Sequence, residues 1–166
     1  MINLVRVDDR VLHGQTITMW LKHISCDGIL IVDDDLFANK ALGDVYRSIA
    51  PDGIRVYIFP VEEGIRKLKE AEKSQKNYIV IFRWLRSFYR VVESGYVLTK
   101  EINVGPASTR DGSELAVKSI YLIPDEIAMY EDLWNRGIKA YFQIIPSVKK
   151  VWWNETELSR KAKGEK

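Results

Sequence analysis

The sequence predicts an α/β protein with a single open, mostly parallel sheet and helices on both faces. Two observations favour this class. Short apolar runs, of the kind found in strands buried on both sides, alternate along the chain with segments whose apolar residues recur at helical spacing. No internal repeat, linker or low-complexity block interrupts the alternation. Parallel strands joined by right-handed helical crossovers are the simplest arrangement for such a pattern.

The predicted strands are short and mostly apolar, and helical segments or turn residues follow them. The second run ends at the three carboxylates of residues 33–35. Seven segments are predicted as strands, in chain order residues 1–5, 29–32, 54–59, 78–82, 101–104, 120–123 and 139–145.

Each predicted helix has one apolar face that we expect to contact the sheet. In the first helix this face consists of Ile17, Trp20, Leu21 and Ile24, and His23 lies off it, on the expected surface. In the second helix the inward row is expected to be Phe37, Ala41, Val45 and Ile49. Three later helices are each expected to direct one set of apolar residues inward. The first set is Val61, Ile65 and Leu68, the second is Leu85, Phe88, Tyr89 and Val92, and the third is Ile127, Tyr130 and Trp134.

Length and composition describe one globular domain. Of the 166 residues, 46% are apolar and 29% are charged, and the net charge of +2 is too small to indicate a nucleic-acid partner. The single cysteine, Cys26, excludes an internal disulfide and is expected to be buried and inert. We expect neither a signal peptide nor a transmembrane segment, and a reducing cytoplasm is the expected compartment.

The stretch with the strongest chemical character is RVDDRVLHGQT, residues 6–16, which joins the first strand to the first helix. His13 is predicted at the start of that helix, where free N–H groups and the helix dipole favour an anion. Backbone N–H groups around Gly14 and Gln15 are expected to act as donors, and Gly14 lets the chain pass close to a phosphate. Arg6 and Arg10 add positive charge. We therefore predict that His13 is a nucleophile that takes up and passes on phosphate.

The charged residues around His13 leave several interpretations open. Arg10 is expected to make a charge-assisted contact with the phosphoryl group. Asp8 or Asp9 could orient an arginine or the imidazole, or could cap the helix. Arg6 could instead be a residue at the strand end that pairs with Asp8 or with Asp33. His13 itself could be an ordinary surface histidine at a helix start.

Two other kinds of site are weighed and not favoured. Asp8, Asp9 and residues 33–35 end neighbouring strands and could hold magnesium, but Arg6 and Arg10 would already neutralise them, so no metal is expected. The chain contains neither a G-x-G-x-x-G stretch after the first strand nor a G-x-x-x-x-G-K-[ST] stretch, so no nucleotide is expected. The proposed chemistry needs no organic cofactor.

A basic face is predicted on the helix that follows residues 78–82. Arg83, Arg86 and Arg90 alternate with Trp84 and Tyr89, a pattern that invites a nucleic-acid interpretation. The aromatic residues lie on the opposite side of the helix and are needed for the core, so a solvated basic face is favoured. Docking of an acidic protein partner remains an alternative.

The stretch RVDDRVLHGQT closely resembles the R-[IV]-D-D-R-[LV]-[IL]-H-G-Q motif of the IIB components of the mannose/fructose/sorbose class of the bacterial sugar phosphotransferase system. Three later stretches agree with this family, VDDDLFANKAL at 32–42, INVG at 102–105 and QIIP at 143–146. The resemblance extends from Asn3 to about Pro146. Residues 1–146 are therefore expected to form the family domain. Residues 147–166, which contain Trp152 and Trp153, are expected to form a partly frayed tail.

The resemblance implies a seven-stranded sheet and a protein-Nπ-phosphohistidine–sugar phosphotransferase. It implies that His13 accepts phosphate from a phosphohistidine of a IIA partner and gives it to a sugar arriving through a membrane IIC/IID complex, with which the chain would associate peripherally. Arg10 would help to hold the phosphoryl group. An alternative is a binding module that only senses phosphorylated partners or sugar phosphates. A homodimer is left open.

The chain departs from the family pattern in a loop that the resemblance places opposite His13. The family usually has a second glycine and a methionine after the N-V-G step, where this chain has Pro106 and Ala107. We therefore expect the loop formed by Gly105, Pro106, Ala107 and Ser108 to differ in shape from that of its relatives.

Overall fold

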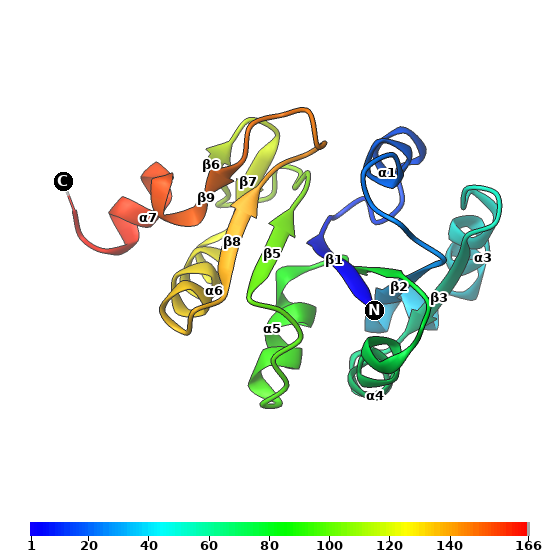
Figure 1. The fold of residues 1–166 in the computed structure, drawn as a ribbon. Coiled ribbons are helices and arrows are strands. Elements are labelled where there is room, and N and C mark those ends of the chain that lie inside the picture. The colour runs from blue at the N-terminus through cyan, green and yellow to red at the C-terminus, as the bar shows by residue number, and fades with distance from the viewer. Residues whose placement is uncertain (166) are drawn as a thin grey trace.

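The computed structural model describes residues 1–165, and Lys166, the last residue of the predicted tail, lies outside the described residues. An open seven-stranded sheet runs through its centre in the order β3-β2-β4-β1-β5-β8-β9 (Figure 1). All neighbouring strands are parallel except β8 and β9, which are antiparallel. This confirms the predicted fold class. The strands are β1 (Ile2–Val7), β2 (Gly28–Val32), β3 (Arg55–Phe59), β4 (Tyr78–Phe82), β5 (Glu101–Val104), β8 (Lys139–Phe142) and β9 (Val151–Trp152).

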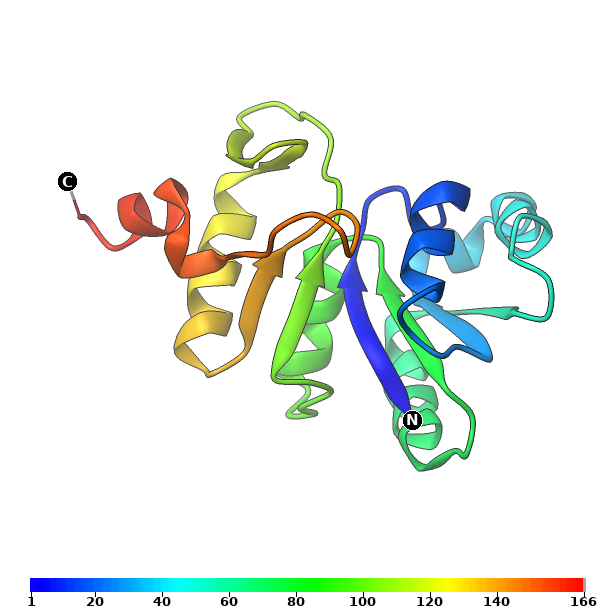
Figure 2. The same cartoon turned by 45° about the horizontal axis from the view of Figure 1, so that its top comes forward.

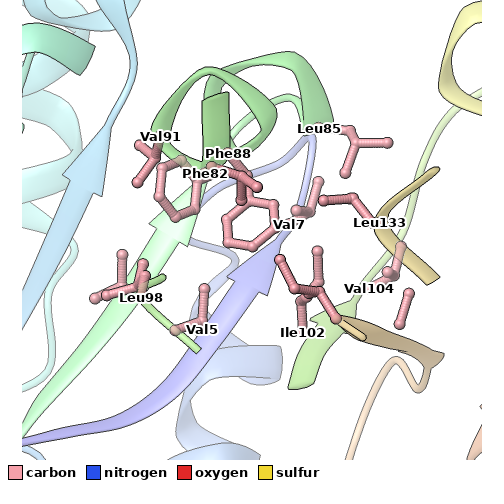
Figure 3. Packing of buried hydrophobic residues seen from close by; sticks show 14 of the residues in the cluster. Val5, Val7, Phe82, Leu85, Phe88, Val91, Leu98, Ile102, Val104 and Leu133 are labelled. Atoms are coloured by element: carbon pink, nitrogen blue, oxygen red, sulfur yellow. The ribbon is translucent and has the colours of Figure 1, made fainter. Parts of the chain in front are cut away.

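Helices cover both faces of the sheet, as predicted, and Figure 1 shows α1 on one side of the strands with α4 and α5 on the other. Successive strand residues point to opposite faces, so Leu4 packs with the side of α1 while Val5 and Val7 pack with the side of α5. Figure 3 shows the second of these cores, in which Phe88 of α5 lies beside Phe82 of β4. The helices are α1 (Gly14–Leu21), α2 (Asp34–Ala38), α3 (Lys40–Ser48), α4 (Val61–Lys73), α5 (Leu85–Glu93) and α6 (Pro124–Asn135).

The carboxyl end of β1 lies where the chain connections change direction. The chain leaves β1 toward α1 on one face, whereas the neighbouring strands β4 and β5 lead to α5 and α6 on the other face. In open α/β sheets, ligands bind in the crevice that such a change of direction leaves between adjacent strands. The segment after β1 therefore lies at the expected place for a functional site, close to the loop after β8 (Figure 2).

One predicted strand of the sheet is wrong. The segment predicted at 120–123 forms β7 (Ile120–Leu122), which pairs with β6 (Glu114–Val117) in a separate antiparallel hairpin. Only Lys118 and Ser119 join the two strands, and Ser119 adopts a positive φ of 66°, so local pairing is reached with a tight turn. The seventh strand of the main sheet is instead β9.

The predicted inward row of the second helix is also wrong. Phe37, Val45 and Ile49 are 48%, 50% and 43% exposed. The segment forms two short helices rather than one, because the Asn39 side chain accepts a hydrogen bond from the Leu42 N–H and starts α3 anew. This break changes the phase of the helical repeat.

The C-terminal tail is folded, whereas the sequence led us to expect a partly frayed segment. After β9 the chain forms a 3₁₀ turn (Trp153–Glu155) and α7 (Glu157–Ala162). Trp153 is fully buried, packs against the rings of Tyr130 and Phe142, and donates a hydrogen bond of 2.7 Å from Nε1 to Glu131 Oε2. Burial of this large side chain against α6 is what holds the tail.

Candidate functional site

The loop between β1 and α1 is held by its own buried apolar residues. Val11 and Leu12 are 3% and 5% exposed and belong to the core beneath α1. Val11 has a positive φ of 60°, and its N–H donates to Asp8 O at 3.0 Å. A β-branched residue rarely adopts this backbone conformation, so the surrounding packing must stabilise it. The turn leaves the side chains of Arg10 and His13 exposed.

Beneath this loop, Arg6 lies at the centre of a buried polar network. Its Nε and Nη2 donate to Asp8 Oδ2 at 3.0 and 2.8 Å. Its Nη1 donates to Asn103 Oδ1 and to Gln143 O, the latter at 3.2 Å, and Nη2 donates to Ile144 O at 3.2 Å. A guanidinium has five N–H donors. All five are therefore used within the protein.

Arg6 is therefore buried, whereas the sequence predicts that it adds positive charge beside His13. Its side chain is 2% exposed, so it does not present positive charge to an anion beside His13. It pairs with Asp8, as in the alternative interpretation, and joins β1 to β5 and to the loop after β8. Burial lowers the pKa of Arg6 and raises the pKa of Asp8, while the attraction between the two charges opposes both changes.

Gly105 and Trp20 enclose this ion pair. A Cβ on Gly105 would lie 2.6 Å from Arg6 Cζ and 2.8 Å from Asp8 Oδ2, which leaves no room for a side chain. The indole of Trp20 lies under the guanidinium, 5.5 Å from ring centroid to Cζ, and its Nε1 donates to Ile144 O at 3.1 Å. The charge is thus sealed from solvent by backbone on one side and an aromatic ring on another.

His13 is the N-cap residue of α1, as the sequence predicts for the helix start. Its side chain is exposed and makes no capping hydrogen bond, and its carbonyl accepts the first helical bond from Ile17 N at 3.0 Å. The N–H groups of the first helical turn have no acceptor within a helix. Here these are the N–H groups of Gly14, Gln15 and Thr16. A shallow pocket of about 560 Å³ lies at this position, lined by His13, Gly14, Gln15, Thr16, Thr18, Met19 and Ile145.

Arg10 and Asp9 lie on the same loop but have different surroundings. The Arg10 N–H donates to Asp8 Oδ1 at 2.9 Å, so the buried pair fixes the backbone that carries the exposed Arg10 side chain. Asp9 Oδ2 accepts from Ser108 N at 2.8 Å, and Asp9 N donates to Pro106 O at 3.3 Å. Asp9 therefore contacts the loop that contains Gly105 to Ser108, and the structure brings this loop beside the β1–α1 loop.

Two of the three carboxylates that follow β2, Asp33 and Asp34, accept hydrogen bonds from backbone N–H groups at helix starts. Asp33 Oδ1 accepts from Leu36 N at 2.8 Å, and Asp34 Oδ1 accepts from Val61 N at 2.8 Å. Asp34 also pairs with Arg90. Within residues 1–165, no group of three His, Cys, Asp or Glu side chains is arranged to hold a metal ion.

The remaining expectations concern residues away from this loop. His23 is exposed, as predicted. Cys26 is half-buried rather than buried, and its Sγ donates to Gly28 O at 3.2 Å. Burial raises the pKa of this thiol. Arg86 and Arg90 are exposed, whereas Arg83 is half-buried and lies over the Trp84 ring, 5.2 Å from ring centroid to Cζ.

Sequence reasoning missed Asn103 and Gln143, which accept hydrogen bonds from Arg6 through a side-chain oxygen and a backbone carbonyl. They are 0% and 7% exposed. The Asn103 side chain joins β5 to the loop after β8, because its Nδ2 donates to Gln143 O at 3.1 Å, and the same backbone carbonyl of Gln143 accepts from Arg6. A signal for both was present, because Asn103 lies between two apolar residues of β5 and Gln143 directly follows the apolar residues of β8.

The fold and the loop define the class of this protein. It is an open α/β protein that presents an exposed histidine and the first amides of a helix where the sheet connections change direction. The model of the family described as "PTS system sorbose subfamily IIB component" matches residues 2–166. The chain belongs to this family, as its motif predicts.

Individual relatives agree with the family assignment. The chain is 27% identical over 146 residues to the PTS system sorbose-specific EIIB component of Klebsiella pneumoniae, covering 88% of each chain. It is 28% identical over 138 residues to the PTS system mannose-specific EIIAB component of Escherichia coli strain K12, covering 83% of this chain and 42% of that protein. The fold resembles the crystal structure of the IIBSor domain of the sorbose permease from Klebsiella pneumoniae, with a TM-score of 0.84, 24% identity and coverage of 98% of this chain and 97% of that one.

Proposed function

We propose that this chain is a phosphoryl carrier that accepts a phosphoryl group on His13 from a phosphohistidine of a IIA partner and transfers it to a sugar. In the first step a lone pair of the His13 imidazole forms an N–P bond while the N–P bond of the donor histidine breaks. In the second step a sugar hydroxyl forms an O–P bond, the His13–phosphorus bond breaks, and the proton of the hydroxyl passes to the released imidazole. The activity is that of a protein-Nπ-phosphohistidine–sugar phosphotransferase.

The observation that carries this proposal is the position of His13 at the N-cap of α1. The exposed imidazole makes no capping hydrogen bond and lies beside the amides of Gly14, Gln15 and Thr16, which have no helical acceptor. Amides at a helix start stabilise an anion. Phosphoryl transfer requires mainly positioning and the balancing of negative charge. The exposed guanidinium of Arg10 would supply the full positive charge.

The remaining loop residues would act through the backbone. The Arg6–Asp8 pair holds the Arg10 N–H, and Asp9 holds the loop of Gly105 to Ser108, so both would fix the shape of the site without contacting phosphate. The chemistry requires no metal or organic cofactor.

The partners follow from the proposed transfer. A IIA protein or domain would donate the phosphoryl group, and the sugar would be presented by a membrane IIC/IID complex at its cytoplasmic side. One relative is named an EIIAB component, and this chain covers 42% of it, which supports a IIA partner. None of the helices within residues 1–165 is both long and apolar enough to cross a membrane.

Mass spectrometry after phosphoryl loading tests the proposal. The chain is incubated with phosphoenolpyruvate, the general phosphoryl-donor proteins and a cognate IIA, and the modified residue is mapped. We expect one phosphoryl group on His13, labile in acid and stable in base, and none on a His13→Gln variant. A module that only senses phosphate would gain no covalent group, and His13→Gln would leave its reversible phosphate binding intact. That outcome would reject the carrier.

A further inference from the structure

β3 forms one edge of the sheet, and β2 is the only strand that pairs with it in residues 1–165 (Figure 1). In a parallel ladder every second residue of a strand bonds to a given neighbour. Phe59 faces β2, because its carbonyl accepts from Asp33 N at 3.0 Å. Val56 and Ile58 have the opposite phase, so their N–H and C=O groups point out of the sheet, while their side chains lie in the core.

A hollow of about 600 Å³ lies beside this edge, between β3 and α4. The half-buried rings of Tyr57 and Phe59 line it and are parallel, with their centroids 6.5 Å apart. The charged side chains of its lining are Glu63, Lys67 and Glu70, all on α4. Glu70 pairs with Lys67 at 3.1 Å, whereas the contact of Glu63 with a cation of α4 is longer, 3.5 Å. Glu63 is therefore the carboxylate of the hollow that is most available to a new cation.

Arg55, the first residue of β3, has the charge that complements Glu63. Its side chain is exposed and forms no ion pair within residues 1–165. Side chains alternate between the faces of a strand, so Arg55 lies on the same face as the rings of Tyr57 and Phe59. This edge thus has an unpaired cation at its start and a weakly paired carboxylate beyond its end. Such a surface is complementary in charge to an antiparallel copy of itself.

One antiparallel register uses all the outward backbone groups of Val56 and Ile58. When Tyr57 lies opposite Tyr57 of a second copy, Val56 lies opposite Ile58 of that copy, and the reverse pair is equivalent. Each of these pairs exchanges both of its N–H···O bonds, as in any narrow pair of an antiparallel ladder. Pro60, which follows the strand, has no N–H and ends the pairing. The two Tyr57 residues form a non-hydrogen-bonded pair on the two-fold axis, where side chains lie closest.

We propose that two copies of this chain pair antiparallel through β3 and form a two-fold dimer with one continuous sheet. Arg55 of each copy lies opposite Phe59 of the other and pairs with its Glu63. The axis reverses the strand direction, so the two His13 loops lie at opposite ends of the joined sheet and both stay open. The dimer therefore goes beyond the proposed function and does not depend on it. Because the contact is centred on a strand of five residues, the dimer is weak and dissociates on dilution.

Analytical ultracentrifugation of the full chain over a concentration series tests the dimer. We expect a reversible equilibrium between monomer and dimer. Amide hydrogen exchange at Val56 and Ile58 is expected to slow at concentrations where the dimer is populated, because these amides gain acceptors only there. A chain that stays monomeric up to about 1 mM would leave this edge to a different partner and overturn the proposal. Assemblies larger than a dimer would lack the two-fold closure and would also overturn it.

Charge reversal identifies the residues of the interface. Arg55→Glu and Glu63→Arg each place like charges across the axis, and each is expected to weaken dimerisation at least about tenfold. An equimolar mixture of the two variants is expected to form a heterodimer, because both ion pairs across the axis are restored, and this recovery also shows that both variants fold. The matched control Lys118→Glu reverses an exposed charge in the turn between β6 and β7 and is expected to dimerise as the unmodified chain does. Dimers that persist in both single variants, or a mixture that stays monomeric, would refute this interface.

Discussion

Replacing Gly105 by alanine tests how tightly the Arg6–Asp8 pair is packed. The new Cβ would lie 2.6 Å from Arg6 Cζ and 2.8 Å from Asp8 Oδ2. Neither partner can turn toward solvent, because Arg6 is 2% and Asp8 is 3% exposed. The substitution must therefore displace the guanidinium from some of its five hydrogen bonds.

The size of the effect follows from two terms. Adding a methyl group to a filled core costs about 1–3 kcal/mol. Breaking a buried ion pair so that one charge loses its partner costs about 3–5 kcal/mol. Because a small backbone shift at Gly105 would strain the pair without separating it fully, we expect the free energy of unfolding to fall by about 3 kcal/mol. For a chain of this size the thermal midpoint would fall by roughly 6–12 °C.

Urea unfolding followed by tryptophan fluorescence measures this change. Gly14→Ala is the matched control, because a Cβ there meets nothing within 4 Å, and alanine is favoured over glycine in a helix by about 1 kcal/mol. Loss of less than about 0.5 kcal/mol in Gly105→Ala, within the range of ordinary surface substitutions, would refute the reasoning. The same holds if a structure of the variant retains all the Arg6 hydrogen bonds.

Three further predictions concern other parts of the molecule. Arg10→Ala is expected to slow phosphoryl transfer through His13 by orders of magnitude in single-turnover assays, because it removes the exposed charge beside the proposed phosphate site. Trp153→Ala is expected to lower the free energy of unfolding by about 3–5 kcal/mol in urea titrations, because it empties a fully buried site. Burial raises the pKa of Asp33 in the folded chain. The protonated carboxyl therefore adds to the free energy of unfolding below its ordinary pKa of about 3.9, and this contribution is lost as the pH rises through the raised pKa. Asp33→Asn is therefore expected to gain stability relative to the unmodified chain as the pH rises above about 4, in urea titrations at a series of pH values.

A control variant or a specific result would contradict each of these three predictions. Arg10→Ala should retain its free energy of unfolding within about 0.5 kcal/mol, and an unchanged transfer rate would remove Arg10 from the site. Trp152→Ala, at a half-buried neighbour, should cost less than Trp153→Ala, and equal losses would contradict the packing described for the tail. A stability difference between Asp33→Asn and the unmodified chain that does not depend on pH would contradict the pKa argument.

Much of the fold could be predicted because strands and helices leave different periods in the sequence. The runs of residues 29–32 and 78–82 are buried on both faces and are continuous in apolar character, so periodicity identifies them. β9 could not be found in this way, since two residues in a charged tail carry no period. The pattern predicts that Phe37 and Val45 face inward, but both are exposed. The helix breaks at Asn39 and restarts with a different phase, and the apolar pattern does not reveal this break.

The candidate site was predictable only where its residues are neighbours in the chain. His13, Gly14 and Gln15 follow one another, so a single motif predicts that they surround a helix start. The environment of Arg6 depends on Asn103 and on Gln143, which are 97 and 137 residues away in sequence. Strand order brings these groups together, and the local pattern contains no information about it. The charge of Arg6 was therefore assigned to the surface rather than to the interior.

The position of β9 has a consequence for how molecules of this chain meet. An open sheet exposes backbone N–H and C=O groups at both edges, and such edges can pair with another chain and start aggregation. At one edge, β9 pairs with Tyr141 and Phe142 of β8 and then turns at once into a 3₁₀ helix, so the outermost strand there is only two residues long. The opposite edge, β3, is five residues long and begins with Arg55. Within residues 1–165, intermolecular strand pairing would therefore start at β3.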